Sequence, residues 1–184
     1  WSIIGKLGPV IYEKSSYELR LEDHLTNVVV KILNISYNPA PHFSGPNGYR
    51  DELEYIYESD RRNSLIQKLV GKLDNNTLIL VNHIAHGEAL EEYFSKLTNK
   101  KVAISAIFST GVNVKNIHNI IFAAGGKSFI RTVQSIGRGL RKHDAKDKLV
   151  IFDICDQLKY GQAHCDKRKT IYDKEKIKYT DVQL

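Results

Sequence analysis

The sequence predicts an α/β fold with a parallel β-sheet, because short apolar segments alternate along it with amphipathic helical segments. Residues 25–37 are rich in β-branched side chains, which is typical of a strand. Residues 38–48 contain three of the four prolines of the chain and predict a loop. Over residues 53–73 the apolar side chains recur at spacings of three and four, as they do on one face of a helix.

From residue 77 onward the alternation becomes regular. Apolar runs predict strands over residues 77–81, 102–107, 118–124 and 148–153. The segments between and after them predict helices over residues 86–97 and 129–141, and then a helix followed by a short strand over 160–178. No internal repeat interrupts this order, so we expect one sheet flanked by helices.

The connection that follows the helix predicted at 86–97 is short. Parallel neighbours need a crossover of about a dozen residues or more, and a complete domain of this type would carry a further strand and helix at this point. We therefore expect a segment to be absent near residues 100–102, between Lys100 and Val102.

Composition narrows the possible classes of protein. With 184 residues, 42% of them hydrophobic and 26% charged, the chain has the make-up of a soluble globular domain. It contains no apolar run long enough to cross a membrane and opens with no signal peptide, so we expect a cytoplasmic protein. Two cysteines are too few for a disulfide framework or a cysteine-based zinc site, and we expect no metal site.

The positive charge is concentrated near the C-terminus. The net charge of the whole chain is +6, and residues 131–178 contain 13 Lys and Arg against 7 Asp and Glu, which is the same excess of six. Such a patch suits a polyanion such as nucleic acid or the phosphates of a nucleotide. A solvated basic face explains the same charge equally well.

The segment from Gln134 to Arg141 is the most specific motif. Arg138 and Arg141 are three residues apart and share one face of the predicted helix, and Gln134, four residues before Arg138, lies on that face too. Gly137 is a poor helix former and suggests close packing or the close approach of a ligand. Two guanidinium groups and an amide on one face can stabilise the charge that develops during phosphoryl transfer.

This Gln-x-x-Gly-Arg-x-x-Arg pattern resembles motif VI of the superfamily 2 helicases. Residues 77–83 resemble motif IV of the same family, and residues 105–113 resemble motif V, with Ser105 in the place of a common Thr and Asn113 in the place of a common Asp. Within the family, residues 108–118 and 134–143 are most similar to the phage UvsW-type helicases, which remodel branched DNA. The resemblance covers most of the chain and implies a RecA-like sheet.

The resemblance also implies how the chain divides into domains and which domain holds the nucleotide. Residues 1–22 would be the tail of a first helicase domain or a linker, and residues 23–184 would form the second RecA-like domain. Because the chain opens at Trp1 without a Met, we expect it to be part of a longer protein. The partners implied are DNA, branched or single-stranded, and the N-terminal RecA-like domain of the same protein, which would hold most of the ATP and Mg²⁺.

Individual roles follow from the resemblance alone. Arg138 and Arg141 would act as arginine fingers on ATP, with Gln134 beside them. The residues bordering the nucleotide would be Gly111 and Asn113. Those near the DNA backbone would be Ser105, Thr110 and His83.

A complete ATPase site is missing from the sequence. Residues 124–128 resemble the end of a phosphate-binding loop, but that motif requires a glycine where Ile121 stands. We therefore expect this chain alone not to hydrolyse ATP. Two other interpretations stay open, namely a stand-alone nucleic-acid-binding module without ATPase activity and a complete nucleotide-binding enzyme that uses Lys127 and Ser128.

Weaker signals have two interpretations each. The basic tail, with Arg168 between Lys167 and Lys169, could follow a phosphate backbone or form a solvated helix face. The tyrosines of the predicted helical region, Tyr49, Tyr55 and Tyr57, could stack on bases, although packing explains them more simply. Cys155 and Cys165 are interpreted as structural.

Overall fold

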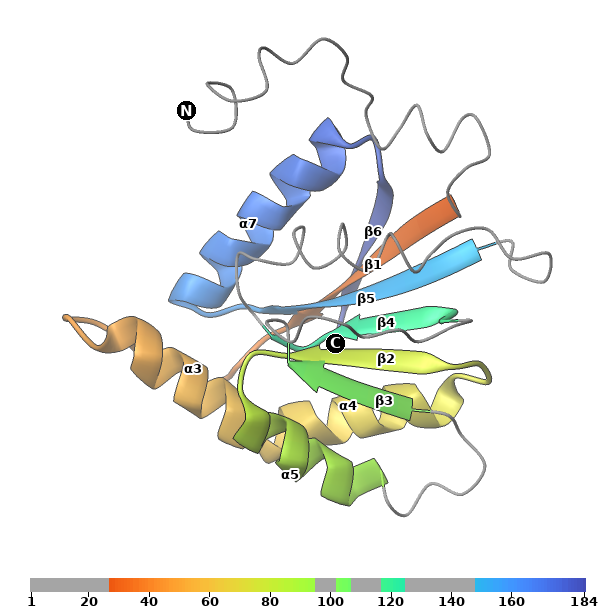
Figure 1. The fold of residues 1–184 in the computed structure, drawn as a ribbon. Helices are drawn as coiled ribbons and strands as arrows, with labels where there is room; N and C mark the ends of the chain where they lie inside the picture. The colour runs from red at the N-terminus through yellow and green to blue at the C-terminus, as the bar shows by residue number, and fades with distance from the viewer. Residues whose placement is uncertain (1–26, 95–101, 107–116, 125–147) are drawn as a thin grey trace, which may run out of the picture.

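A computed structural model describes residues 27–94, 102–106, 117–124 and 148–184. They form a six-stranded sheet in the order β3-β2-β4-β5-β1-β6, with every neighbouring pair parallel (Figure 1). The strands are β1 (Asn27–Ile35), β2 (Thr77–Val81), β3 (Val102–Ala106), β4 (Asn119–Phe122), β5 (Lys148–Asp156) and β6 (Lys178–Gln183). The predicted α/β architecture is confirmed.

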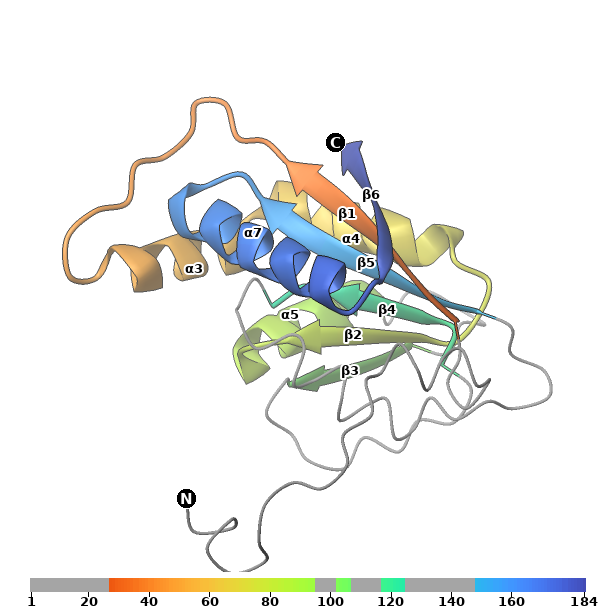
Figure 2. The same cartoon turned by 90° about the horizontal axis from the view of Figure 1, so that it is seen from above.

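In the part of the chain that the structure describes, helices lie on both faces of the sheet. On one face lie α4 (Asp60–Lys72) and α5 (Ile84–Phe94), and on the other lies α7 (Lys159–Lys174) (Figures 1 and 2). The remaining described helix, α3 (Gly48–Glu58), lies beyond the carboxyl ends of the strands. Strands that are apolar on both sides, such as β2 with all five residues buried, are what a sheet covered on two faces requires.

The alternation of side chains along each strand divides the core into two clusters. On the α7 face, Ile32 and Ile151 pack with Cys165 and Tyr172 of the helix. On the opposite face, apolar residues of five strands pack with α4 and α5. Because successive side chains of a strand point to opposite faces, neighbouring residues of β5 contribute to different layers.

Most predicted elements differ by a few residues in their bounds, and two of the differences have a clear structural reason. The helical region at 53–73 is two helices, because Ser59 has an extended backbone and its hydroxyl accepts a hydrogen bond from the Arg62 amide at 3.4 Å, which starts a new helix. Strand β5 continues three residues beyond the predicted 148–153, since the pairing with β1 extends to Ile35 opposite Asp156. The predicted helix at 129–141 and the predicted domain tail at 1–22 lie outside the described residues.

The absent segment expected near residues 100–102 is not required by the observed topology. Strands β2 and β3 are parallel neighbours, and the 20 residues from 82 to 101 that join them include α5. A connection of that length is sufficient for a crossover between parallel neighbours, because α5 itself forms it. The junction at 100–101 lies outside the described residues, so the chain path there stays untested.

Candidate functional site

The segments that contain the predicted motifs begin at the carboxyl edge of the sheet. Because β2, β3 and β4 are parallel, their C-terminal ends lie at one edge. Asn82 and His83 follow β2, the segment 107–116 starts after Ala106 of β3, and the segment 125–147 starts just beyond β4, after Ala124. Ligands of open α/β sheets bind at this edge, so its position agrees with the three predicted motifs.

Most of the predicted site residues lie outside the part of the chain that the structure describes. Only His83 and Ser105 are within it. Ser105 belongs to β3, opposite Leu80 of β2, and His83 is exposed just after β2. The others are Thr110, Gly111, Asn113, Gln134, Arg138 and Arg141, and their roles stay predictions.

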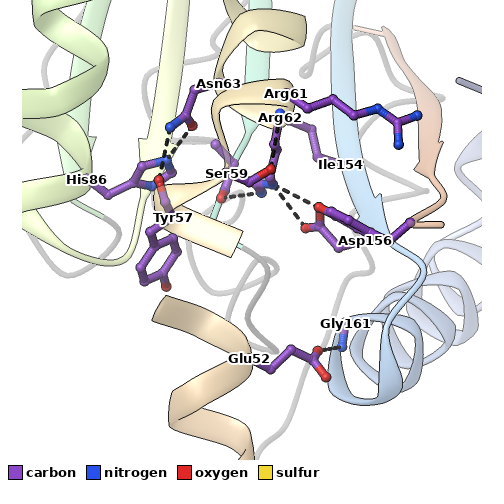
Figure 3. Close-up of polar contacts among 12 residues, drawn as sticks. Glu52, Tyr57, Ser59, Arg61, Arg62, Asn63, His86, Ile154, Asp156 and Gly161 are labelled. Carbon is purple, nitrogen blue, oxygen red and sulfur yellow. Dashed lines mark hydrogen bonds and ion pairs between the residues drawn. The ribbon is translucent and has the colours of Figure 1, made fainter. Parts of the chain in front are cut away.

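His83 stands next to a stacked aromatic pair. The ring of Tyr57 lies 5.2 Å from the His83 ring and stacks on the His86 ring at 4.7 Å. Unlike His83, His86 is only 3% exposed, and its Nε2 lies 3.3 Å from the Asn63 amide oxygen (Figure 3). Burial, together with the positive charge of Arg62 and the neighbouring His83, lowers the pKa of His86 to about 3. His86 is therefore a neutral packing residue, and only His83 is available to a ligand.

A buried ion pair lies at the same edge, and the sequence analysis did not identify it. Arg62 of α4 and Asp156 at the end of β5 have side chains 0% and 1% exposed, and the Arg62 Nε is 2.9 Å from Asp156 Oδ1 (Figure 3). Asp156 Oδ1 also accepts a hydrogen bond from the Tyr37 hydroxyl at 2.7 Å. Burial and the negative charge of Asp156 raise the pKa of Tyr37, so the tyrosine stays a neutral donor.

A carboxylate holds the start of α7 against α3. Glu52 of α3 is 1% exposed, and its side chain accepts hydrogen bonds from the backbone amides of Tyr160 at 3.0 Å and Gly161 at 2.6 Å. A negative charge at a helix N-terminus is favourable, because the first amides of a helix lack partners within it. Position 161 must be glycine, since a Cβ there would lie 2.5 Å from the Asp156 carbonyl oxygen.

The interpretation of the basic tail as a phosphate-following surface is wrong for Arg168. Its side chain is 1% exposed and its Nε donates to Asp153 Oδ2 at 2.9 Å. The Tyr172 hydroxyl donates to the same oxygen at 2.8 Å. Lys169 is also engaged, 2.8 Å from Asp181 of β6, while Lys167 is exposed. The arginine is therefore part of the core.

The described residues do not form a metal site. Across these ranges no group of three or more His, Cys, Asp or Glu side chains is placed to hold a metal ion. Cys155 and Cys165 are buried free thiols on β5 and α7, which supports a structural role for both.

No helix within the described ranges is long and apolar enough to cross a membrane.

With the parallel sheet and its edge established, comparison with known proteins identifies the relationship. The chain is similar to a phage DNA helicase. It is 26% identical to the "ATP-dependent DNA helicase uvsW" of Enterobacteria phage T4, over 83% of this chain and 37% of the helicase. The chain thus spans less than half of the length of that relative. The resemblance to UvsW-type helicases predicted from the motifs is confirmed.

Solved structures show the same fold. The crystal structure of T4 UvsW matches with a TM-score of 0.72 and 24% identity, over 85% of this chain and 41% of UvsW. A second match is the ATP-dependent Type ISP restriction-modification enzyme LlaBIII bound to DNA, with a TM-score of 0.56 and 14% identity, over 97% of this chain and 17% of the enzyme. No family model matches the chain. The sheet is therefore of the RecA-like type found in these helicase-related enzymes.

Proposed function

We propose that this chain is the second motor domain of an ATP-dependent superfamily 2 DNA helicase that unwinds or remodels branched DNA in recombination and repair. The similarity to T4 UvsW along most of the chain is the observation that carries this proposal. The common carboxyl edge of β2, β3 and β4 supports it, because all three motif segments follow from strands that end there. For a phage protein, the place of action would be the cytoplasm of the host.

In this proposal the domain completes an ATP site that another domain begins. An N-terminal RecA-like domain of the same protein would hold most of the ATP and Mg²⁺, and Arg138, Arg141 and Gln134 would approach the phosphates from this side. Guanidinium groups neutralise the negative charge that spreads over the transferred phosphoryl group. Gly111 and Asn113 would border the nucleotide, and closure of the two domains would couple hydrolysis to movement on DNA.

DNA binding in this proposal uses hydrogen-bonding groups at the edge of the sheet. His83 is exposed there and can donate to a phosphate oxygen, while Ser105 and Thr110 supply hydroxyl groups of the kind that contact DNA backbones. Such contacts are independent of sequence and weaken as salt is added.

Alanine at Arg138 tests the catalytic part of the proposal. In a protein that carries both motor domains, Arg138→Ala is expected to lower ATP turnover by about 10³-fold or more, the effect typical of an arginine finger, and to leave DNA affinity nearly unchanged. Turnover is measured by phosphate release and affinity by fluorescence anisotropy with a labelled fork. Lys167→Ala, at an exposed lysine of α7, is the matched control. Turnover that survives in the Arg138 variant contradicts the proposal.

Alanine at His83 tests the DNA-binding part. We expect His83→Ala to weaken binding of branched DNA by about tenfold to a hundredfold, since one hydrogen bond to a charged group contributes about 1.5–3 kcal/mol. His42→Ala is a suitable control, because His42 is also exposed but lies in the loop before α3. Equal affinities of the two variants would remove His83 from the DNA surface.

A further inference from the structure

The guanidinium group of Arg62 joins three elements at the carboxyl edge of the sheet. Its Nε contacts both carboxylate oxygens of Asp156, at 2.9 and 3.2 Å, and its Nη2 donates to the Ala123 carbonyl oxygen at 2.8 Å. Through these bonds α4 is attached to the end of β5 and to the residue that follows β4. Both ionised side chains are fully buried, so water does not compete for these bonds.

The carbonyl groups held here are the last ones before the segment that carries the predicted fingers. Ala123 and Ala124 follow the final residue of β4, and residue 125 begins the segment to Lys148. The side-chain amide of Asn82 donates to the Ala124 carbonyl oxygen, next to the bond from Arg62 to Ala123. The Ala123 amide donates to the Leu80 carbonyl oxygen at 2.9 Å. Two side chains from other elements therefore fix the backbone at the point where it leaves the sheet.

We propose that Arg62 is a positioning residue for ATP hydrolysis, because it fixes the place and direction in which the chain leaves β4 toward Gln134, Arg138 and Arg141. This inference rests on the function proposed above. Arg62 itself does not contact the nucleotide in this scheme. It acts through the Ala123 carbonyl, and Asp156 and Tyr37 hold its guanidinium group in place.

Stability alone is a poor explanation for an arginine at this position. A buried ion pair often contributes no more to stability than apolar residues of the same volume would. Within the described residues, the Arg62 Nη1 is buried and has no hydrogen-bond partner, which costs stability further. The guanidinium group donates a hydrogen bond to the Ala123 carbonyl oxygen, which an apolar side chain could not do.

A matched control is available on the other face of the sheet. Arg168 is equally buried and pairs with Asp153 at the same distance of 2.9 Å, but its Nη2 donates to the Ile154 carbonyl oxygen within β5. Replacing Arg168 therefore removes a buried ion pair of the same kind but leaves the hydrogen bond to the Ala123 carbonyl oxygen in place. Arg62→Met and Arg168→Met differ in which backbone segment loses its support.

The first arm of the test follows backbone exchange in this 184-residue chain. Amide hydrogen exchange is measured by mass spectrometry for peptides that cover residues 120–128, under conditions in which each variant is folded. Arg62→Met is expected to accelerate exchange there by about tenfold, which corresponds to about 1.4 kcal/mol of lost protection. Arg168→Met should leave these peptides near the wild-type rate. Equal acceleration in both variants would overturn the proposal.

The second arm measures catalysis in a protein that carries both motor domains. Arg62→Met is expected to lower kcat for ATP about tenfold with little change in KM, while Arg168→Met, corrected for its folded fraction, keeps kcat. Arg62→Lys keeps the charge and should restore part of the rate, and it replaces the Met variant if that variant fails to fold. A kcat for Arg62→Met equal to that of Arg168→Met would refute the positioning role.

The Arg138→Ala variant separates the two possible failures. If it retains turnover, the proposed function itself is wrong. If it loses turnover while the Arg62 and Arg168 variants behave alike, the function stands and only the positioning role of Arg62 is lost.

Discussion

The two buried ion pairs of β5 have the same chemistry and different surroundings. Asp153 points to the α7 face and pairs with Arg168, and Asp156 points to the α4 face and pairs with Arg62. Each carboxylate also accepts a hydrogen bond from a tyrosine hydroxyl, from Tyr172 in the first case and from Tyr37 in the second. One strand thus attaches both helical layers to the sheet by equivalent bonds.

The difference lies in what else each arginine touches. Among the described residues, Arg168 lies over the Phe122 ring at 5.1 Å and donates to the Ile154 carbonyl oxygen of β5. Arg62 binds the Ala123 carbonyl at the edge where the predicted functional segments begin. The comparison teaches that a residue's role depends on where its hydrogen bonds lead as well as on its burial.

The largest expected effect comes from breaking either pair. Asp153→Ala and Asp156→Ala each leave a buried arginine without its counter-ion, and each is expected to lower the free energy of unfolding by about 3–5 kcal/mol. Urea denaturation followed by circular dichroism measures this change, with the exposed Asp74→Ala as a control near zero. A double replacement, Asp153→Leu with Arg168→Leu, is expected to recover much of the loss. A loss below 1 kcal/mol for either single variant would show that its pair is not buried in solution.

Acid tests the Arg62 side of the sheet, because His86 on that side has a strongly lowered pKa. The pKa of His86 is about 3 in the folded protein and 6.5 when unfolded, so between these values the unfolded chain binds a proton that the folded protein excludes. Stability therefore falls as the pH drops from about 6.5 toward 3, by at most about 1.4 kcal/mol per pH unit from this group. Urea denaturation at pH 7 and pH 5 measures the slope, and His86→Gln should reduce it. An unchanged slope in that variant would mean that His86 is protonated in the fold.

The smallest effect is expected at the exposed ion pair between α7 and β6. Lys169 lies 2.8 Å from Asp181, but these side chains are 26% and 43% exposed. Lys169→Ala should cost about 0.2–1 kcal/mol, and the cost should decrease in 1 M salt because exposed charges are screened. Thermal unfolding at low and high salt measures both values. A cost as large as that of the buried pairs would contradict the distinction between them.

The sequence was sufficient where local patterns determine structure. Strand β2 has the predicted bounds, Thr77–Val81, because an apolar run bounded by asparagines leaves little choice. The resemblance of residues 105–113 and 134–141 to helicase motifs pointed to the correct fold, although most of these residues lie outside the described ranges. Arg62 lies four and eight residues before Ile66 and Val70, a spacing that places it on their buried face, but the sequence analysis did not identify it.

Long-range pairing could not be predicted in the same way. The partner of Arg62 is 94 residues away, and nothing in the local sequence of either residue specifies the other. Arg168 was interpreted as part of a basic surface because Lys167 and Lys169 flank it. Its spacing from the buried Cys165 and Tyr172 was the better indication of its position.

The place of β1 in the sheet has a consequence for synthesis on the ribosome. Its partners are β5 and β6, which are made more than a hundred residues later than β1 itself. During synthesis, β1 therefore has neither of its neighbouring strands until β5 and β6 have been translated. The contacts that hold β1 in the sheet are thus among the last that this domain can form during its synthesis.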